Sequence, residues 1–189
     1  MTKKYYEPRI LSDTDDLYTY LELRETLESY IQRTTDLVAI NTGLEVNVPT
    51  YVIMPPTIYG LGSGIGNRTS IQLPNIIRSA IKSGNVNVLG AGTGTWDTVH
   101  VEDLAQLYEL LLRRVIVGDD IPSGKQGIFF AETGDYTWLQ LSQGLANELA
   151  NQGVLKSNEV KHLSLKEAAD LGTFTGGNVQ LAELAFASK

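Results

Sequence analysis

The 189-residue sequence contains no cysteine, so it has no disulfides, no thiolate metal sites and no cysteine nucleophile. It has only two histidines, His100 and His162, so no metal site is expected. Basic residues number 15 against 22 acidic ones, and the net charge of −7 argues against a nucleic-acid binder. The sequence also lacks the long apolar runs of membrane proteins and the apolar leader of secreted ones. These absences predict a cytoplasmic protein with neither a nucleic acid nor a membrane as partner.

A hydrophobic fraction of 42% is ample for a packed core, and its spacing predicts an alternation of helices and strands. Short polar residues before Leu17 predict a helix start, and the apolar stripe continues to Ile31. Thr34-Thr35-Asp36 marks a second cap or a continuation, and the helix should fade near Asn47 because Pro49 follows. The further predicted strands are 50–54, 86–89, 96–101, 127–131 and 160–163, and the further helices are 70–83, about 103–115, 138–151 and 165–171. The ends, 1–12 and beyond 171, show no clear pattern.

Two glycine clusters suggest a phosphate-binding loop, but neither has the required spacing. Glycines stand at positions 60, 62, 64 and 66 and again at 90, 92 and 94. The dinucleotide fingerprint G-x-G-x-x-G would need its third glycine where Ile65, Asn67 or Thr95 stands. We therefore interpret both clusters as flexible loops.

Two other segments are more specific. Pro55-Pro56-Thr57-Ile58-Tyr59-Gly60 follows an apolar strand, and Val99-His100-Val101-Glu102-Asp103-Leu104-Ala105 joins a strand to a helix. In this order and separation, the two segments resemble the extended short-chain dehydrogenase/reductases, also called the NAD-dependent epimerase/dehydratase family. The resemblance covers most of residues 10–150. With Met54 where many members carry arginine, it points to the atypical oxidoreductases of fungi and bacteria.

The resemblance implies positions for cofactor and substrate. Pro55 and Pro56, at the carboxyl end of the strand, would pass beside the nicotinamide of NAD or NADP. Thr57 would face the substrate. Asn67 and Arg68 lie in the loop that enters the substrate domain and would either contact the substrate or stand as ordinary surface residues.

In this family His100 and Asp103 would be structural, with Asp103 stabilising the start of a helix near residue 103. The family's catalytic Tyr-x-x-x-Lys is missing, because no lysine occurs between residues 5 and 81. Tyr30 and Arg33 lie nearest the expected position, one residue out of register. Arginine could hold a ribose but tunes a tyrosine pKa poorly, and an ordinary helix surface is the competing interpretation.

The predicted fold is α/β: the C-terminal part of a Rossmann-like doubly wound parallel sheet plus a small α/β substrate-binding subdomain. Residues 1–60 would hold the last units of the NAD(P)-binding domain, and 61–189 the substrate-binding subdomain interleaved with the final sheet elements. The missing strands would need about 100 more residues, which predicts that the chain is a fragment. The predicted function is NAD(P)-dependent oxidoreductase or epimerase/dehydratase chemistry on a small carbonyl or hydroxyl substrate. The alternative is a non-catalytic NAD(P)-sensing or regulatory protein, and a homodimer is left open.

Overall fold

The computed structural model describes residues 10–171, which form two compact units. The first holds the described residues up to Pro56 together with Asp103–Glu132. The second holds Thr57–Glu102 and the described residues from Thr133 onward. The predicted irregular ends lie largely outside the described residues. Among those residues, no helix is long and apolar enough to cross a membrane.

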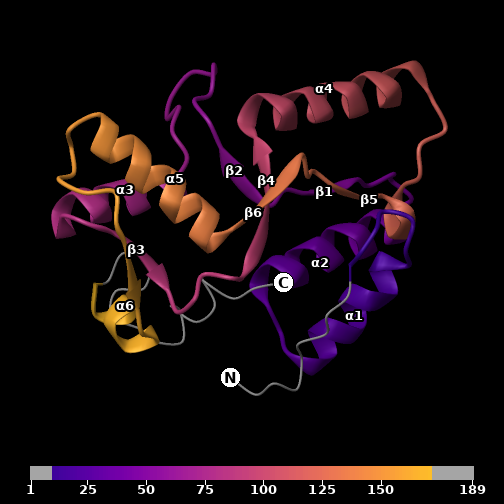
Figure 1. Ribbon diagram of the computed structural model, residues 1–189. Coiled ribbons are helices and arrows are strands. Elements are labelled where there is room, and N and C mark those ends of the chain that lie inside the picture. Colours follow the sequence, from indigo (N-terminus) through magenta and orange to yellow (C-terminus); the bar gives the residue numbers. More distant parts are fainter. Residues whose placement is uncertain (1–9, 172–189) are drawn as a thin grey trace. The chain divides into compact units, whose positions relative to one another are not determined.

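The first unit is built around two short parallel strands. β1 pairs with β5 in the register Val52↔Ile128 to Met54↔Phe130. Between them the chain passes through α4, which Figure 1 shows above the strands, whereas α1 and α2 lie below them. The bounds are α1 Leu17–Leu27, α2 Ile31–Glu45, β1 Val52–Met54, α4 Val101–Val117, a 3-10 turn Gly124–Gln126 and β5 Ile128–Phe130.

A compact apolar core joins α1 and α2 to β5. Ile40 is fully buried and Ile128 is 2% exposed. The other buried members are Leu17, Tyr18 and Leu37. α1 begins where Asp16 accepts a hydrogen bond from the Thr19 backbone N–H at 3.1 Å, as the polar run before Leu17 predicts.

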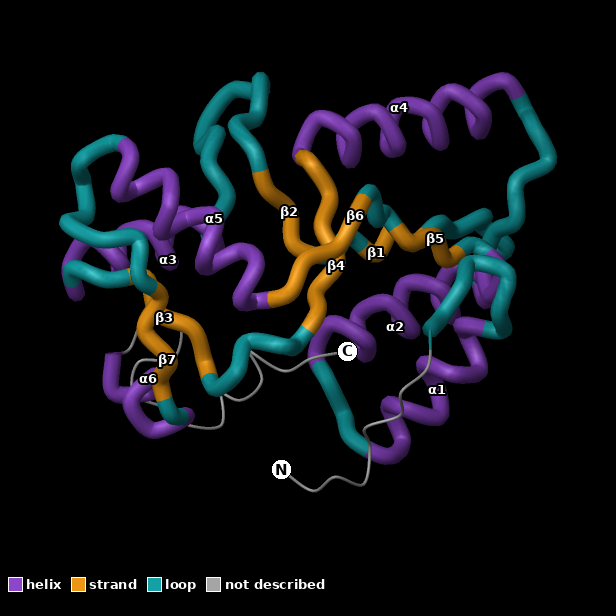
Figure 2. Tube along the Cα trace, viewed as in Figure 1, coloured by secondary structure: helices purple, strands orange, loops and turns teal. Residues whose placement is uncertain are grey.

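The second unit contains two separate small sheets. One has the order β2-β4-β6, with β2 parallel and β6 antiparallel to β4, and Figure 2 shows these strands meeting. The other pairs β3 with β7 in parallel. Ala80, Val86, Ala146, Leu149 and Leu155 form the core between α3, α5 and the β3–β7 sheet. The bounds are β2 Thr57–Tyr59, α3 Gln72–Ser83, β3 Val86–Leu89, β4 Thr95–His100, β6 Gly134–Thr137, α5 Trp138–Asn151, β7 Val160–Leu163 and α6 Leu165–Leu171.

The structure differs from the sequence prediction at four places. The stripe from Leu17 to Ile31 is interrupted, because α1 ends at Leu27 and α2 begins at Ile31 rather than near Thr34. α4 begins at Val101, two residues before the expected position. β2 and β6 were not predicted as strands. The remaining predicted elements are confirmed within one or two residues at most ends.

Candidate functional site

One face of the β2-β4-β6 sheet gathers hydroxyl and aromatic side chains. Thr57 lies opposite Thr98, Tyr59 opposite His100 and Trp96 opposite Tyr136. Side chains directly opposite each other share a face, and so do alternate residues of one strand. The face therefore consists of Thr57, Tyr59, Trp96, Thr98, His100 and Tyr136, and we call it the hydroxyl–aromatic face. It contains the residue predicted to face the substrate, Thr57.

Two hydroxyls on this face are buried. Thr57 is 3% exposed, and neither its Oγ1 nor the Tyr136 OH makes a hydrogen bond of good geometry with a described residue. Burial raises the pKa of Tyr136, and the neighbouring Thr57 hydroxyl offsets part of that rise. A buried hydroxyl that lacks a well-formed hydrogen bond costs up to about 1–3 kcal/mol. Such groups are therefore either tolerated at a cost or completed by another molecule.

The Tyr136 ring belongs to a cluster with two tryptophan rings. Trp138 packs against Trp96 and Tyr136, with ring centroids 5.7 Å apart in both cases. Trp138 is the first residue of α5, and a capping box fixes that helix start: Thr137 accepts from Gln140 N–H at 3.1 Å, while Gln140 accepts from Thr137 N–H at 2.7 Å. The capping box thus positions the ring that packs on the sheet.

The two family-like segments contact each other at the other end of the face. The rings of Tyr59 and His100 meet edge-on with centroids 5.2 Å apart. Gly60 has φ +98°, and a Cβ at this position would overlap the His100 ring. Only glycine combines that backbone conformation with that close approach. The pairing explains physically why Tyr-Gly and Val-His-Val occur together.

His100 also caps α4. Its Nδ1 accepts a hydrogen bond from the Glu102 backbone N–H at 3.2 Å, the arrangement of an N-cap residue. Asp103, expected to supply the cap, is exposed and lies in the first turn of the helix instead. Its carboxylate is left with the weaker role of facing the positive end of the helix dipole.

Asn67 and Arg68 close their own loop. Arg68 Nε donates to the Gly62 carbonyl at 2.5 Å, and Gly62 N–H donates back to the Arg68 carbonyl at 2.9 Å. Asn67 Oδ1 accepts from the backbone and hydroxyl of Thr69 at 3.2 and 3.0 Å. Glu102 fixes the loop to the start of α4 by accepting from Ser63 N–H at 2.9 Å. The two side chains predicted to touch substrate therefore hold the loop's shape.

The backbone carbonyls of the second glycine cluster also form hydrogen bonds within the protein. The carbonyls of Gly92 and Gly94 accept from the Leu139 and Trp138 N–H groups at 2.9 and 3.0 Å. These bonds satisfy amides at the start of α5 that an anion would otherwise use. Both clusters act as structural loops in the described residues.

Tyr30 and Arg33 lie together at the start of α2. The Arg33 guanidinium lies over the Tyr30 ring, 5.8 Å from its centroid. Arg33 also forms an ion pair with Glu25 at 3.3 Å and donates to the Glu28 carbonyl at 2.8 Å. Arg33 is therefore neutralised by a carboxylate.

Glu25 organises this cluster. Its carboxylate accepts from the Thr34 hydroxyl, from the Ser29 hydroxyl at 2.7 Å and from the Tyr30 backbone N–H at 3.1 Å. The hydrogen bonds from Thr34 and then Ser29, with smaller help from Tyr30 and Arg33, lower the pKa of Glu25 to about 2. Glu25 thus serves as a remote cap for α2, whose N-cap residue, Tyr30, makes no side-chain capping bond.

A lysine lies over the ring of a second tyrosine in the same unit. Lys125 Nζ lies over the Tyr18 ring, 4.3 Å from its centroid. The Tyr18 OH instead lies 2.6 Å from Glu22 Oε1 and 2.7 Å from Asn41 Oδ1. The bond to Glu22, followed by burial, raises the Tyr18 pKa. A tyrosine that exchanges protons in catalysis needs a lowered pKa, so this pair is structural.

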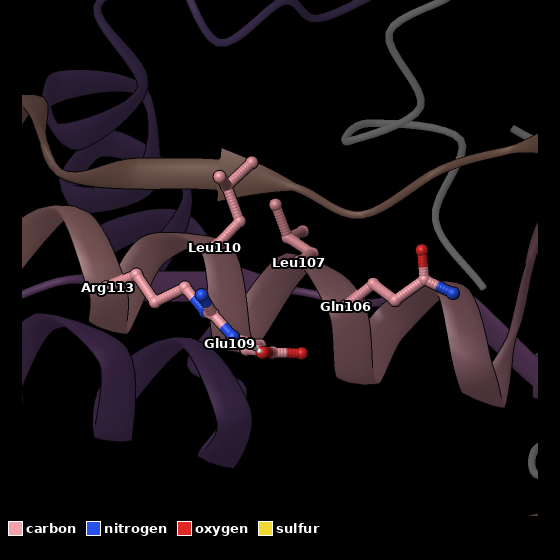
Figure 3. A pocket seen from close by; sticks show the side chains of 5 residues that line it. All are labelled: Gln106, Leu107, Glu109, Leu110 and Arg113. Atoms are coloured by element: carbon pink, nitrogen blue, oxygen red, sulfur yellow. Dashed lines mark hydrogen bonds and ion pairs between the residues drawn. The ribbon is translucent and has the colours of Figure 1, made fainter.

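Pro55 and Pro56 follow β1 directly. Met54 accepts from Ala131 N–H at 3.2 Å, which extends the parallel pairing just beyond β5. Ligands of open α/β sheets bind outside the carboxyl ends of the strands, where these prolines stand. One surface depression of this unit lies elsewhere, on a single helix, and is lined by Gln106, Leu107, Glu109, Leu110 and Arg113 (Figure 3). It contains none of the predicted site residues.

Sequence reasoning missed Tyr136, Trp96 and Trp138. β6 reads Gly-Asp-Tyr-Thr, which is too short and polar to show a strand period. A weak signal was present, since Thr137 and Gln140 have capping-box spacing directly after Tyr136.

The sequence of the chain matches one known protein family. The model of one family, described as the NAD dependent epimerase/dehydratase family, matches residues 15–121. The chain belongs to this family. The match includes both segments that carry the resemblance in the sequence, and that prediction is confirmed.

One curated relative matches part of the chain. The chain is 24% identical over 132 residues to Oxidase ucsJ from an Acremonium species, covering 66% of this chain and 38% of that protein. The chain thus spans well under half the length of this curated relative.

Solved structures share the fold at low identity. The PbgP3 protein from Burkholderia pseudomallei has a TM-score of 0.53 at 15% identity, covering 82% of this chain and 50% of its own. GDP-mannoheptose C4 reductase from Campylobacter jejuni with NADP bound has a TM-score of 0.50 at 16% identity, covering 72% and 46%. These likenesses confirm the predicted α/β class with parallel, Rossmann-like strands.

Proposed function

We propose that the protein is an NAD(P)-dependent oxidoreductase or epimerase/dehydratase whose substrate binds at the hydroxyl–aromatic face. The observation that carries the proposal is the position of Thr57. It is buried beside Tyr136 and follows directly after Pro55 and Pro56, the strand end at which the family would place the nicotinamide. Family membership and the oxidase relative support redox chemistry on a carbonyl or hydroxyl group.

The residues present fit only one end of a dinucleotide. By the resemblance, a nicotinamide would pass beside Pro55 and Pro56. The backbone groups of the glycine clusters, however, form hydrogen bonds within their own loops and with the start of α5. The clusters therefore provide no cradle for a pyrophosphate. When bound, the cofactor would supply or accept a hydride. The described residues bind and orient the substrate.

In this proposal Thr57 and Tyr136 orient a substrate oxygen. Each hydroxyl has hydrogen-bonding capacity, and both are shielded from bulk water. The resemblance leaves Tyr30 as the candidate for proton transfer, and Arg33 beside it is paired with Glu25. Asn67 and Arg68 would act by holding the loop next to the face.

A non-catalytic NAD(P)-sensing protein is the second candidate, and the Glu25–Arg33 ion pair favours it. A catalytic tyrosine needs a nearby cation to lower its pKa, and here the nearest cation is neutralised. The sequence also offers no lysine between residues 5 and 81 as a substitute.

A hydride-transfer assay on the full-length protein tests the proposal. NADH or NADPH is mixed with a panel of small ketones, aldehydes and nucleotide sugars, and cofactor absorbance is followed. We expect turnover with at least one compound, loss of turnover in Thr57→Val, and no change in Tyr108→Phe, which alters an exposed residue of α4. Cofactor binding without turnover would support the sensing protein, and absence of both would contradict both candidates.

A further inference from the structure

The hydroxyl–aromatic face has no lysine or arginine. β2, β4 and β6 contain neither lysine nor arginine. Their only ionisable acids, Asp97 and Asp135, lie opposite each other on the other face of the same sheet. A sheet with this composition is a poor partner for an anion.

The basic residues described in the second unit belong mainly to other elements. Arg78 and Lys82 lie on α3, and the others are Lys156, Lys161 and Lys166 in the segment from 156 to 166. Arg68 is the exception, because its loop continues directly from β2. Its Nε already donates to the Gly62 carbonyl. Diphosphates are usually bound by several cations or free backbone amides acting together.

The face instead offers flat aromatic rings. Tyr59, Trp96, His100 and Tyr136 are each half-buried, so part of each side chain remains accessible. Aromatic surfaces bind flat rings by offset or edge-on stacking, without needing charge. Binding pockets for small molecules are typically lined in this way, with a few polar groups that fix orientation.

The polar groups that could fix orientation are the Thr57 and Tyr136 hydroxyls. Both are shielded from water and lack hydrogen bonds of good geometry to described residues. A single hydroxyl or carbonyl oxygen on a ligand would complete them, whereas a charged phosphate would have to be desolvated beside them.

We propose that the hydroxyl–aromatic face selects an uncharged substrate with a flat ring and a hydroxyl or carbonyl oxygen, rather than a nucleoside diphosphate sugar. The inference rests on the proposed function for the location of the substrate. It assigns the ring to Trp96 and Tyr59, and the oxygen to Thr57 and Tyr136.

Fluorine NMR of protein labelled with 5-fluorotryptophan tests this substrate class directly. The chain contains two tryptophans, and both belong to the ring cluster, so each resonance reports on the site. The full chain is titrated without cofactor against acetophenone, which is uncharged and carries a ring and a carbonyl, and against UDP-glucose. We expect acetophenone to shift at least one resonance with saturation and UDP-glucose to shift neither.

Matched variants separate the hydroxyl from the ring. Tyr136→Phe keeps the ring and should weaken acetophenone binding about five-fold, the loss of one hydrogen bond. Tyr108→Phe makes the same change on exposed α4 and should leave binding unchanged. Retained fluorine chemical shifts in the free variants establish that the cluster is still folded.

Saturable resonance shifts with UDP-glucose, or no shifts with acetophenone, would overturn the inference. If Tyr136→Phe bound acetophenone with wild-type affinity, the role of the hydroxyl pair would be overturned. Because no cofactor is present, these results are independent of hydride transfer. Turnover of a nucleotide sugar would leave the proposed function standing and remove only this inference.

Discussion

The His100 ring lies edge-on to Tyr59, with an angle of 83° between the ring planes, and closes against the bare backbone of Gly60. The same imidazole accepts the Glu102 N–H at the start of α4. One side chain thus joins the end of β2 to the beginning of a helix more than forty residues later in the sequence, with Tyr59↔His100 as the register pair.

Gly60→Ala should therefore destabilise the protein. The new methyl group would need a strained φ of +98° and would push on a ring held by Tyr59 and by Glu102. We expect a loss of about 1–3 kcal/mol, measured by urea unfolding. Gly64→Ala is the control, because its Cβ would meet nothing within 4 Å, and it should change stability by less than about 0.5 kcal/mol. Equal effects of the two substitutions would contradict the close packing at Gly60.

His100 should matter more than Asp103 for the stability of α4. His100→Ala removes the capping bond and should cost about 0.5–2 kcal/mol. His100→Asn restores an oxygen that can cap and should recover part of the loss. Asp103→Ala removes only a dipole interaction of about 0.3–1 kcal/mol, and Asp103→Asn should leave any turnover unchanged. Melting temperatures for the four variants measure the difference, and a larger loss in Asp103→Ala would reverse the assignment.

The sequence predicts most helix boundaries because local chemistry determines them. Gly84 ends α3 with φ +76°, and the polar side chain at Thr137 starts α5. The break between α1 and α2 has no such signal, since Leu27 and Ile31 are spaced as in a continuous helix. Glu28 and Tyr30 are extended there, and hydrogen bonds from Ser29, Tyr30 and Thr34 to Glu25 hold the break, so its cause is a local side-chain cluster that the apolar spacing does not reveal.

The candidate site likewise contains one residue that the local sequence predicts and one that it does not. Thr57 was predicted because it follows a recognisable strand end and motif. Tyr136 could not be predicted, because it is brought to the site only by the antiparallel register Trp96↔Tyr136 between segments far apart in sequence. That pairing depends on the path of the intervening chain, which no local pattern describes.

Glu25 should make the free energy of unfolding depend on pH in the acidic range. Its pKa in the folded protein is about 2, below the ordinary glutamate value of 4.5, because the hydroxyls of Thr34 and Ser29 stabilise the carboxylate. A lowered folded pKa gives stability that is present above the unfolded pKa and is lost as pH falls toward the folded one. Glu25→Gln should therefore be less stable than wild type at neutral pH, and the difference should shrink between about pH 5 and pH 2.

Urea midpoints across that range test the acid dependence. Glu45→Gln, at the exposed end of α2, is the control and should show no comparable change. A difference between Glu25→Gln and wild type that stays constant with pH would show that the carboxylate charge is not what stabilises the α1–α2 junction.

The 189-residue chain should bind NADH and NADPH weakly, with a Kd above about 1 mM. The reason is that the glycine loops make internal hydrogen bonds and present no helix start to a pyrophosphate. Calorimetric titration measures the affinity. Micromolar binding would contradict this expectation and would require an anion site that these loops do not form.

The exposed apolar surface of α4 should make this chain self-associate. No other described element packs extensively against this helix, and Leu112 and Ile116 are 59% and 74% exposed one turn apart. Contiguous apolar surface of this kind favours association. Sedimentation velocity should show species larger than a monomer, and Ile116→Lys should shift them toward the monomer. Gln106→Lys adds the same charge without removing apolar surface and should not, because burial of that surface drives the association; a monomeric wild-type chain would refute the expectation.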